Sequence, residues 1–123
     1  MFDHVGLNVK DYPASRAFYL AALAPLGYQP VMEFDEWKAV GFGAVDKPEF
    51  WVAEREPYGT GTHVAFACPD RATVDAFHAA AVAAGGTDNG PPGLREHYHP
   101  TYYAAFVHDP DGNNVEAVCH KPE

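Results

Sequence analysis

The sequence predicts an α+β fold of two tandem βαβββ modules, which form curved mixed sheets with their helices outside. The first observation behind this prediction is an internal repeat, because a gapless shift that places His4 on His63 aligns the two halves. The same shift pairs a helix-capping residue, an apolar helix residue and a terminal glycine, namely Asp11 with Asp70, Phe18 with Phe77, and Gly27 with Gly86. The second observation is that strand and helix patterns follow in the same order in each half. We therefore expect one domain, with a first module at 1–58 and a second at 59–123.

Composition places the chain among globular proteins and narrows its partners. The 123 residues are 47% hydrophobic and 14% aromatic. A net charge of −9 without any basic run argues against nucleic acid and anionic membranes as partners, and leaves a small molecule as the expected one. No apolar run reaches the roughly 20 residues that a membrane span needs, and the N-terminus lacks a signal-peptide pattern. Two cysteines make no disulfide framework, so we expect a cytoplasmic protein.

The first half reads as a strand, a helix and three shorter strands. Residues Met1–Val9 alternate, with Val5, Leu7 and Val9 on the expected buried face and His4, Gly6 and Asn8 on the other. The helix is expected over Asp11–Ala24, with Asp11 as its N-cap and with a buried stripe of Ala14, Phe18, Ala21 and Ala22. The later strands are expected at Tyr28–Phe34, Trp37–Phe42 and Phe50–Ala53, and the residues Glu54–Gly61 read as a linker.

The second half restarts the same pattern. Thr62–Pro69 alternates, so that Val64, Phe66 and Cys68 lie opposite His63, Ala65 and Ala67. A helix is expected over Asp70–Ala84, with a buried side of Val74, Phe77, Ala81 and Val82. A further strand is expected within Thr87–Leu94, and a hairpin closes the module. Cys68 and Cys119 both fall on the helix side, where we expect free buried thiols.

The hairpin within Ala104–His120 carries the strongest local signal. Asp109-Pro110-Asp111-Gly112 suits a type I turn followed by a left-handed glycine, which gives a three-residue loop. Pairing outward from this loop sets Glu116 opposite Phe106 and on one face with Tyr102 and Ala104, while Tyr103, Ala105 and Val107 lie under the helix. A carboxylate in an apolar strand needs a partner, because a lone buried charge is costly.

The repeat suggests that partner. His4 and His63 occupy one structural slot, beside small residues that leave room in front of them. The first-module counterpart of Glu116 is about Trp51. One cavity would thus hold two histidines and one carboxylate, a set that suits a divalent transition metal such as iron(II) or manganese(II). Because each half is too small to bury its core well, the two halves, or halves of two chains, should pack together.

The loop before the hairpin concentrates further polar and aromatic groups, which are Arg95, His97, Tyr98, His99, Tyr102 and Tyr103. Histidine titrates near neutrality, so His97 or His99 could act as a general acid or base. The alternative is that these side chains only pack or cap. The expected substrate contacts are Trp51, Arg95, Tyr102 and Phe106, with Trp51 and Phe106 as apolar walls across the cavity.

The chain resembles the vicinal oxygen chelate superfamily, which includes glyoxalase I, extradiol dioxygenases and bleomycin-resistance proteins. The resemblance covers the whole length and rests on DHVGLNV, ASRAFYLAALAPLGY, GTHVAFA and FVHDPDGNNVEAV. It implies the glyoxalase/bleomycin resistance/dihydroxybiphenyl dioxygenase-like fold, a homodimer, and a divalent ion (Fe2+, Mn2+, Ni2+ or Zn2+) bound by His4, His63 and Glu116. The fourth ligand of glyoxalase I is replaced by Trp51 or Val52. His97 resembles a histidine near the extradiol metal, but Phe106 stands where those enzymes have a tyrosine.

Two functions follow as hypotheses. The first is a metal-dependent enzyme that chelates two adjacent oxygens of a small substrate, with a lyase, isomerase or dioxygenase outcome. The alternative is a metal-free protein that binds a drug or metabolite in the same cavity, as the bleomycin-resistance members do. A vestigial site is the third reading.

Overall fold

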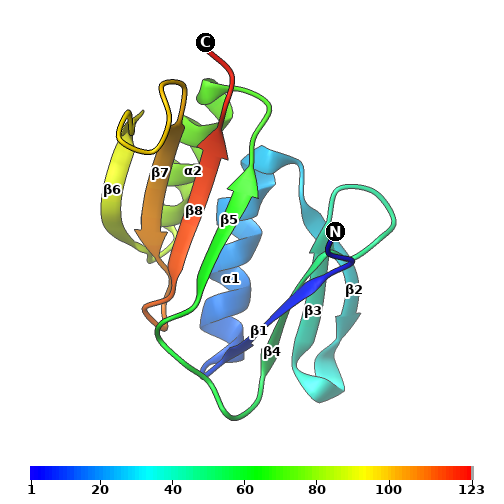
Figure 1. Ribbon diagram of the computed structural model, residues 1–123. Helices are drawn as coiled ribbons and strands as arrows, with labels where there is room; N and C mark the ends of the chain where they lie inside the picture. Colours follow the sequence, from blue (N-terminus) through cyan, green and yellow to red (C-terminus); the bar gives the residue numbers. More distant parts are fainter. Residues whose placement is uncertain (123) are drawn as a thin grey trace.

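The computed structural model describes residues 1–122 and has two modules with the same order of elements (Figure 1). The elements of the first module are β1 (Val5–Val9), α1 (Tyr12–Leu23), β2 (Gln29–Phe34), β3 (Ala39–Gly43) and β4 (Phe50–Glu54). Those of the second are β5 (His63–Ala67), α2 (Arg71–Ala83), β6 (Thr87–Leu94), β7 (Tyr103–His108) and β8 (Asn114–Cys119). The predicted βαβββ modules are thus confirmed, as is the strand expected within Thr87–Leu94.

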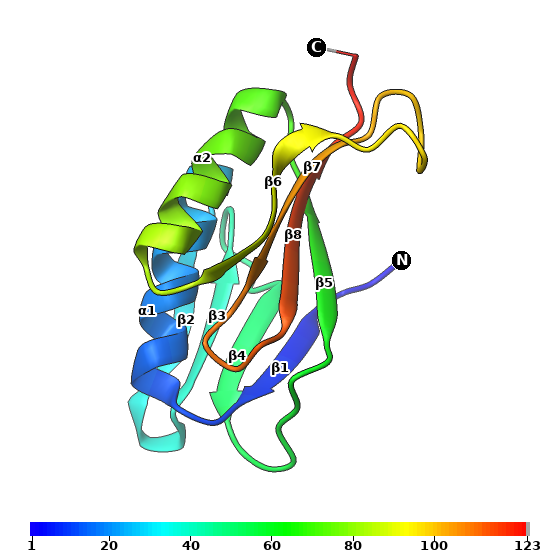
Figure 2. The same ribbon diagram turned by 90° about the vertical axis from the view of Figure 1, so that its left-hand side faces the viewer.

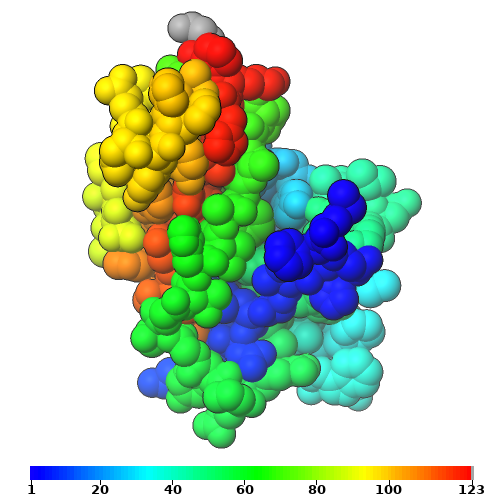
Figure 3. Space-filling view, viewed as in Figure 1, coloured from blue at the N-terminus to red at the C-terminus, as the bar shows by residue number. Residues whose placement is uncertain are grey.

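Each module forms one four-stranded mixed sheet. The strand orders are β1-β4-β3-β2 and β5-β8-β7-β6, and in each sheet the first two strands are parallel while the others are antiparallel. Both helices cover the same side of the two sheets, and within residues 1–122 the opposite faces have no helix over them (Figure 2). We call these opposite faces the open faces. Figure 3 looks onto the open faces, where the loop before β7 projects over one end of the second sheet.

Capping aspartates start both helices, as predicted. The Asp11 carboxylate accepts a hydrogen bond from the Ala14 backbone N at 3.1 Å, and Asp70 accepts one from the Thr73 N at 2.8 Å. Each cap satisfies an amide that has no partner within the first turn. The helices begin one residue after these caps, and end one residue before the predicted bounds.

The structure corrects the predicted buried stripes of both helices. In α1, Ala14 is exposed and Ala21 is half-buried, whereas the larger side chains of Tyr19 and Leu23 are fully buried. In α2, Val82 is 40% exposed. The reason is that α1 packs against α2 as well as against its own sheet. Its buried surface is therefore wider than the predicted stripe and includes long side chains.

The third predicted strand also begins later than expected. Asp35–Trp37 forms a short 3₁₀ turn, and Lys38 follows with a left-handed backbone at φ 51°. The chain can return into β3 only after that residue, so the strand starts at Ala39 instead of Trp37.

One hydrophobic core joins the two modules. The Phe66 ring of β5 packs edge-on against Phe50 of β4, with ring centroids 5.3 Å apart, and against Tyr28 at 6.0 Å. Cys68 and Cys119 are free and buried in this core, as predicted, and burial raises the pKa of the Cys68 thiol to about 11. Within residues 1–122, no helix is long and apolar enough to cross a membrane.

Candidate functional site

The β7–β8 turn sets the register of the site. The Asp109 N donates to the Asn113 carbonyl at 2.9 Å, the Gly112 N donates to the Asp109 carbonyl at 2.9 Å, and Gly112 has a left-handed φ of 91°. This is the predicted three-residue loop. Phe106 therefore pairs with Glu116, and Ala105 and Val107 are buried in the core under α2.

Asp109 fixes this turn from within. Its carboxylate is 4% exposed and accepts hydrogen bonds from the Asp111 N, the Asn113 N, the Asn113 side chain and the Tyr19 hydroxyl of α1. Asn113 in turn accepts from the Thr62 N at 3.0 Å, directly before β5. The turn thus holds the start of β5, and His63 follows as the first residue of that strand.

Glu116 finds its partner on β5. Its carboxylate is 2% exposed, and His63 Nε2 donates to Oε1 at 2.9 Å. The Tyr102 hydroxyl donates to the other oxygen, Oε2. Burial, followed by this hydrogen bond, raises the pKa of Tyr102 to about 12, so the phenol keeps its proton at neutral pH. The His63 side chain is 52% exposed, which leaves its ring open to a ligand.

The loop before β7 encloses the other side of this face. Tyr98 packs edge-on against Tyr102, with centroids 5.1 Å apart, and the His97 ring lies 4.2 Å from Tyr98. The Arg95 guanidinium lies 5.3 Å from the centre of the Phe106 ring and donates to the carbonyls of Gly93 and Pro91. A pocket of about 280 Å³ lies there, lined by Asn89, Gly90, Arg95, His97, Tyr98, Phe106 and Asn114.

The structure separates the two candidate loop histidines. His97 lines the pocket beside Arg95 and Phe106. His99 instead accepts a hydrogen bond on Nδ1 from the Thr101 N at 3.2 Å, and its ring lies 6.2 Å from that of His120. His97 is therefore the better placed of the two for contact with a ligand on this face.

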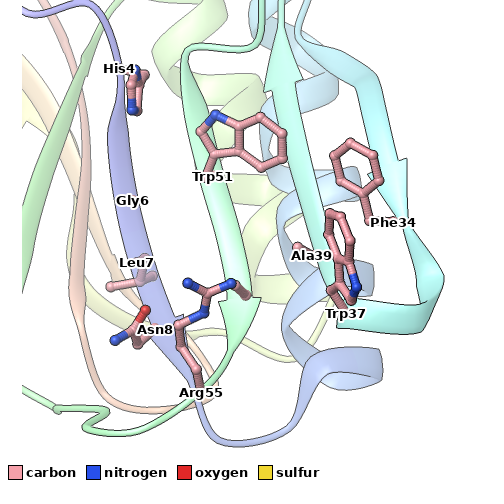
Figure 4. Close-up of a pocket in the computed structure, with 10 residues that line it drawn as sticks. His4, Gly6, Leu7, Asn8, Phe34, Trp37, Ala39, Trp51 and Arg55 are labelled. Atoms are coloured by element: carbon pink, nitrogen blue, oxygen red, sulfur yellow. The ribbon is translucent and has the colours of Figure 1, made fainter.

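On the first sheet, Trp51 occupies the place that Glu116 has on the second. Trp51 pairs with Gly6 of β1, and Glu116 pairs with Ala65 of β5, which is the residue the repeat aligns with Gly6. The open face here contains a pocket of about 370 Å³ (Figure 4). Its ten lining residues are His4, Gly6, Leu7, Asn8, Phe34, Trp37, Ala39, Trp51, Ala53 and Arg55.

Two of the three expected metal ligands lie together within one chain. His63 contacts Glu116 on the second sheet, whereas His4 lines the pocket of the first sheet and contacts Asp3 at 2.7 Å. Among residues 1–122, no group of three or more histidine, cysteine, aspartate or glutamate side chains could hold a metal ion. A single chain therefore does not fit a three-ligand metal site. Trp51 and Phe106 likewise line different pockets of the chain.

Sequence reasoning did not identify several residues of the first-sheet pocket. Phe34 and Trp37 flank an acidic pair that read as a polar turn, and Arg55 lay in the predicted linker. The available signal was Gly41, which pairs with Trp51. A Cβ built at Gly41 would lie 2.9 Å from the indole, so the glycine leaves the space that the Trp51 ring occupies.

Known proteins share this architecture. The sequence model of the Glyoxalase/Bleomycin resistance protein/Dioxygenase superfamily matches residues 1–117. A glyoxalase/bleomycin resistance protein from Albidiferax ferrireducens T118 is 32% identical, with a TM-score of 0.83 over 98% of this chain and 99% of its own. A glyoxalase/dioxygenase from Nostoc punctiforme is 21% identical, with a TM-score of 0.72 over 98% of this chain and 91% of its own. A glyoxalase-related enzyme from Fulvimarina pelagi is 20% identical, with a TM-score of 0.71 over 94% of this chain and 84% of its own. A comparison with curated proteins finds no match.

Proposed function

The chain belongs to the Glyoxalase/Bleomycin resistance protein/Dioxygenase superfamily, and from this premise we propose that it is a metal-dependent enzyme acting on a small substrate. The observation that carries the proposal is the pair of His63 Nε2 and Glu116 Oε1, 2.9 Å apart, with Glu116 buried and the His63 ring accessible. Imidazole and carboxylate together are a usual donor set for divalent transition metals.

A second copy of the chain supplies the missing ligand in this proposal. His4 and His63 both lie on open faces, and their side chains are 57% and 52% exposed. We propose a homodimer in which His4 of one chain faces His63 and Glu116 of the other. In this dimer, His4 of one chain together with His63 and Glu116 of the other would hold a divalent ion, which would supply Lewis-acid polarisation of two adjacent substrate oxygens.

The residues around Glu116 have separate roles in this proposal. Tyr102 holds the carboxylate in place by donating to Oε2. Phe106 and Tyr98 give the pocket beside this face its aromatic wall. His97 lines the same pocket with an exposed ring, and accepts or returns a proton at the substrate. Arg95 is held by backbone carbonyls beside Phe106, and it binds a negatively charged part of the substrate.

The experiment measures metal content and metal uptake of the full chain. Protein purified without chelator should contain a divalent ion, measured by mass spectrometry, and Mn2+ uptake should be measurable by electron paramagnetic resonance. His63→Ala should abolish uptake. The matched control is His78→Ala, because His78 also contacts a carboxylate, that of Asp88 at 2.8 Å, but lies on α2. That control should bind metal normally.

Mixed dimers test whether the site is shared between chains. His4→Ala chains and His63→Ala chains should each fail to bind metal as homodimers. A heterodimer of the two, isolated with two affinity tags, should regain one of its two sites, since one chain supplies His4 and the other His63 and Glu116. The shared site would be contradicted if the heterodimer bound no metal under conditions in which the wild type does. It would also be contradicted if metal-bound wild-type protein sedimented as a monomer.

A second function is favoured by the first-sheet pocket. Its three aromatic side chains and volume of about 370 Å³ are those of a small-molecule binding site that needs no metal. In that case the chain would be a binding protein, as the bleomycin-resistance part of the family name indicates. A chain that stays free of metal in the experiment above yet binds an aromatic ligand would support this function over the enzyme.

A further inference from the structure

We infer that the open face of the first sheet binds a planar aromatic ligand that carries a carboxylate or a similar anionic group. The pocket of about 370 Å³ lies at the small end of the roughly 300–1,000 Å³ typical of ligand sites. It suits a molecule of one or two fused rings.

Three aromatic side chains form one side of the pocket, and we call them the aromatic platform (Phe34, Trp37 and Trp51). The Phe34 and Trp51 rings are within 9° of parallel, with centroids 6.2 Å apart, and Trp37 lies 4.9 Å from Phe34. Phe34 is 39% and Trp37 63% exposed, so the platform presents ring surface to solvent. Exposed aromatic faces gain from stacking with another flat ring.

The space for this platform is provided by Gly41. The Trp51 indole lies against β3 at that residue, where any side chain would collide with it. On the second sheet the corresponding pair is Phe106 with Glu116. The first sheet therefore holds its large aromatic side chain flat on the open face, at the position where the second sheet holds its buried acid.

The other side of the pocket carries nitrogen donors. Figure 4 shows His4, Asn8 and Arg55 on the β1 side of the Trp51 ring, opposite Phe34 and Trp37. Within the described part of the chain, the Arg55 guanidinium makes no hydrogen bond or ion pair, whereas Arg16 is paired with Glu33 and Lys38 with Glu54. An unpaired guanidinium beside an apolar surface favours a carboxylate, which it can bind through two hydrogen bonds.

The charge of this pocket is opposite to that of the whole protein. The chain carries 17 acidic residues and a net charge of −9, yet none of the ten lining residues is acidic. Among neighbouring carboxylates, Glu54 contacts Lys38 and the Tyr12 N, whereas Asp3 contacts both Lys47 and the lining residue His4. Net charge alone would favour a cationic ligand, but these local contacts favour an anionic one.

The inferred ligand is a more specific description of the small substrate in the proposed function. The inference rests on that function only for the claim that the bound molecule then reacts. Binding can be measured on chelator-treated full-length protein, so a failure to bind metal leaves the result intact. Loss of ligand binding, in turn, leaves the metal measurements intact.

The test compares three probes by isothermal titration calorimetry: 2-naphthoate, 2-naphthylmethylamine and cyclohexanecarboxylate. Naphthoate should bind at least about tenfold more tightly than the amine, which lacks the anion, and than the cyclohexane acid, which lacks the flat ring. It should also quench tryptophan fluorescence. Equal affinity for naphthoate and the amine would overturn the inference.

Variants assign the binding to this pocket. Arg55→Gln should weaken naphthoate binding about tenfold and leave binding of neutral 2-naphthalenemethanol unchanged. Trp37→Ala should weaken binding of both probes. Because Trp37 is largely exposed, this variant should keep the wild-type fold, which circular dichroism checks. Arg71→Gln on α2 is the matched control and should bind as wild type. Unchanged naphthoate affinity in Arg55→Gln and Trp37→Ala would overturn the inference.

Discussion

Two carboxylates are buried in the β7–β8 hairpin, and they differ in their surroundings. Asp109 accepts hydrogen bonds from four donors, three of them within its own turn and the fourth the Tyr19 hydroxyl of α1. Glu116 accepts from His63 and Tyr102, and both donors lie on the open face. At the scale of single residues, Asp109 is a structural residue, whereas Glu116 keeps a partner that a ligand can displace.

This difference predicts opposite effects of two substitutions. Asp109→Ala leaves several buried donors without an acceptor, so it should lower the free energy of unfolding by about 3–5 kcal/mol. Glu116→Gln removes a buried charge while an amide oxygen can still accept a hydrogen bond, so stability should change by about 1 kcal/mol or less. Urea denaturation measures both changes. Similar losses of stability in the two variants would contradict these roles.

At the scale of elements, local chemistry predicted much of the fold. Asp11 and Asp70 marked the helix starts, and Asp109 to Gly112 fixed the hairpin register, because these signals lie within a few residues of their effect. The 3₁₀ turn before β3 was missed, since nothing local required Lys38 to adopt a positive φ. The Tyr19 contact with Asp109 was also missed, because no sequence pattern links residues so far apart.

A second prediction at this scale compares a phenylalanine of α2 with one on the open face of β7. Phe77 of α2 is fully buried, so Phe77→Ala should cost about 3–5 kcal/mol of stability. Phe106 is half-buried on the open face, so Phe106→Ala should cost about 1–2 kcal/mol, from lost contact with Arg95 and the sheet. Thermal denaturation of both variants checks the order. A larger loss for Phe106→Ala would show that the open face is packed as a core.

At the scale of the molecule, the repeat predicted the metal ligands as equivalent but could not place them together. The equivalence of Trp51 and Glu116 holds in the strand pairing. Whether His4 meets His63 depends on how two open faces meet, and that arrangement is set by surfaces on both modules and on a second chain. Repeats encode the shape of each module, whereas no periodicity encodes the contact between them.

Burial across both modules predicts a loss of stability at alkaline pH. The pKa of Cys68 is raised to about 11, and those of Tyr28 and Tyr102 to about 12, in each case first by burial. The folded state thus holds these protons more tightly than the unfolded state. The contribution of these groups to the free energy of unfolding is complete below about pH 9, the ordinary thiol pKa, and should be lost as the pH rises through 12.

Urea midpoints between pH 8 and 11.5, together with tyrosinate absorbance at 295 nm, measure this effect. Tyr28→Phe removes one of the groups and should flatten the decline above pH 10. An unchanged midpoint up to pH 11.5, or tyrosinate formation complete before any loss of stability, would contradict the prediction.

The hydrogen bond from Tyr19 to Asp109 has a consequence for the order in which the protein folds during synthesis. It joins residues 90 positions apart, and the Lys10 N bonds to Asp111 across 101 positions. Contacts that close such long loops form late, since the chain between them must first be ordered. During synthesis on the ribosome, the Tyr19 hydroxyl of α1 therefore has no Asp109 acceptor until the β7–β8 hairpin of the second module has emerged.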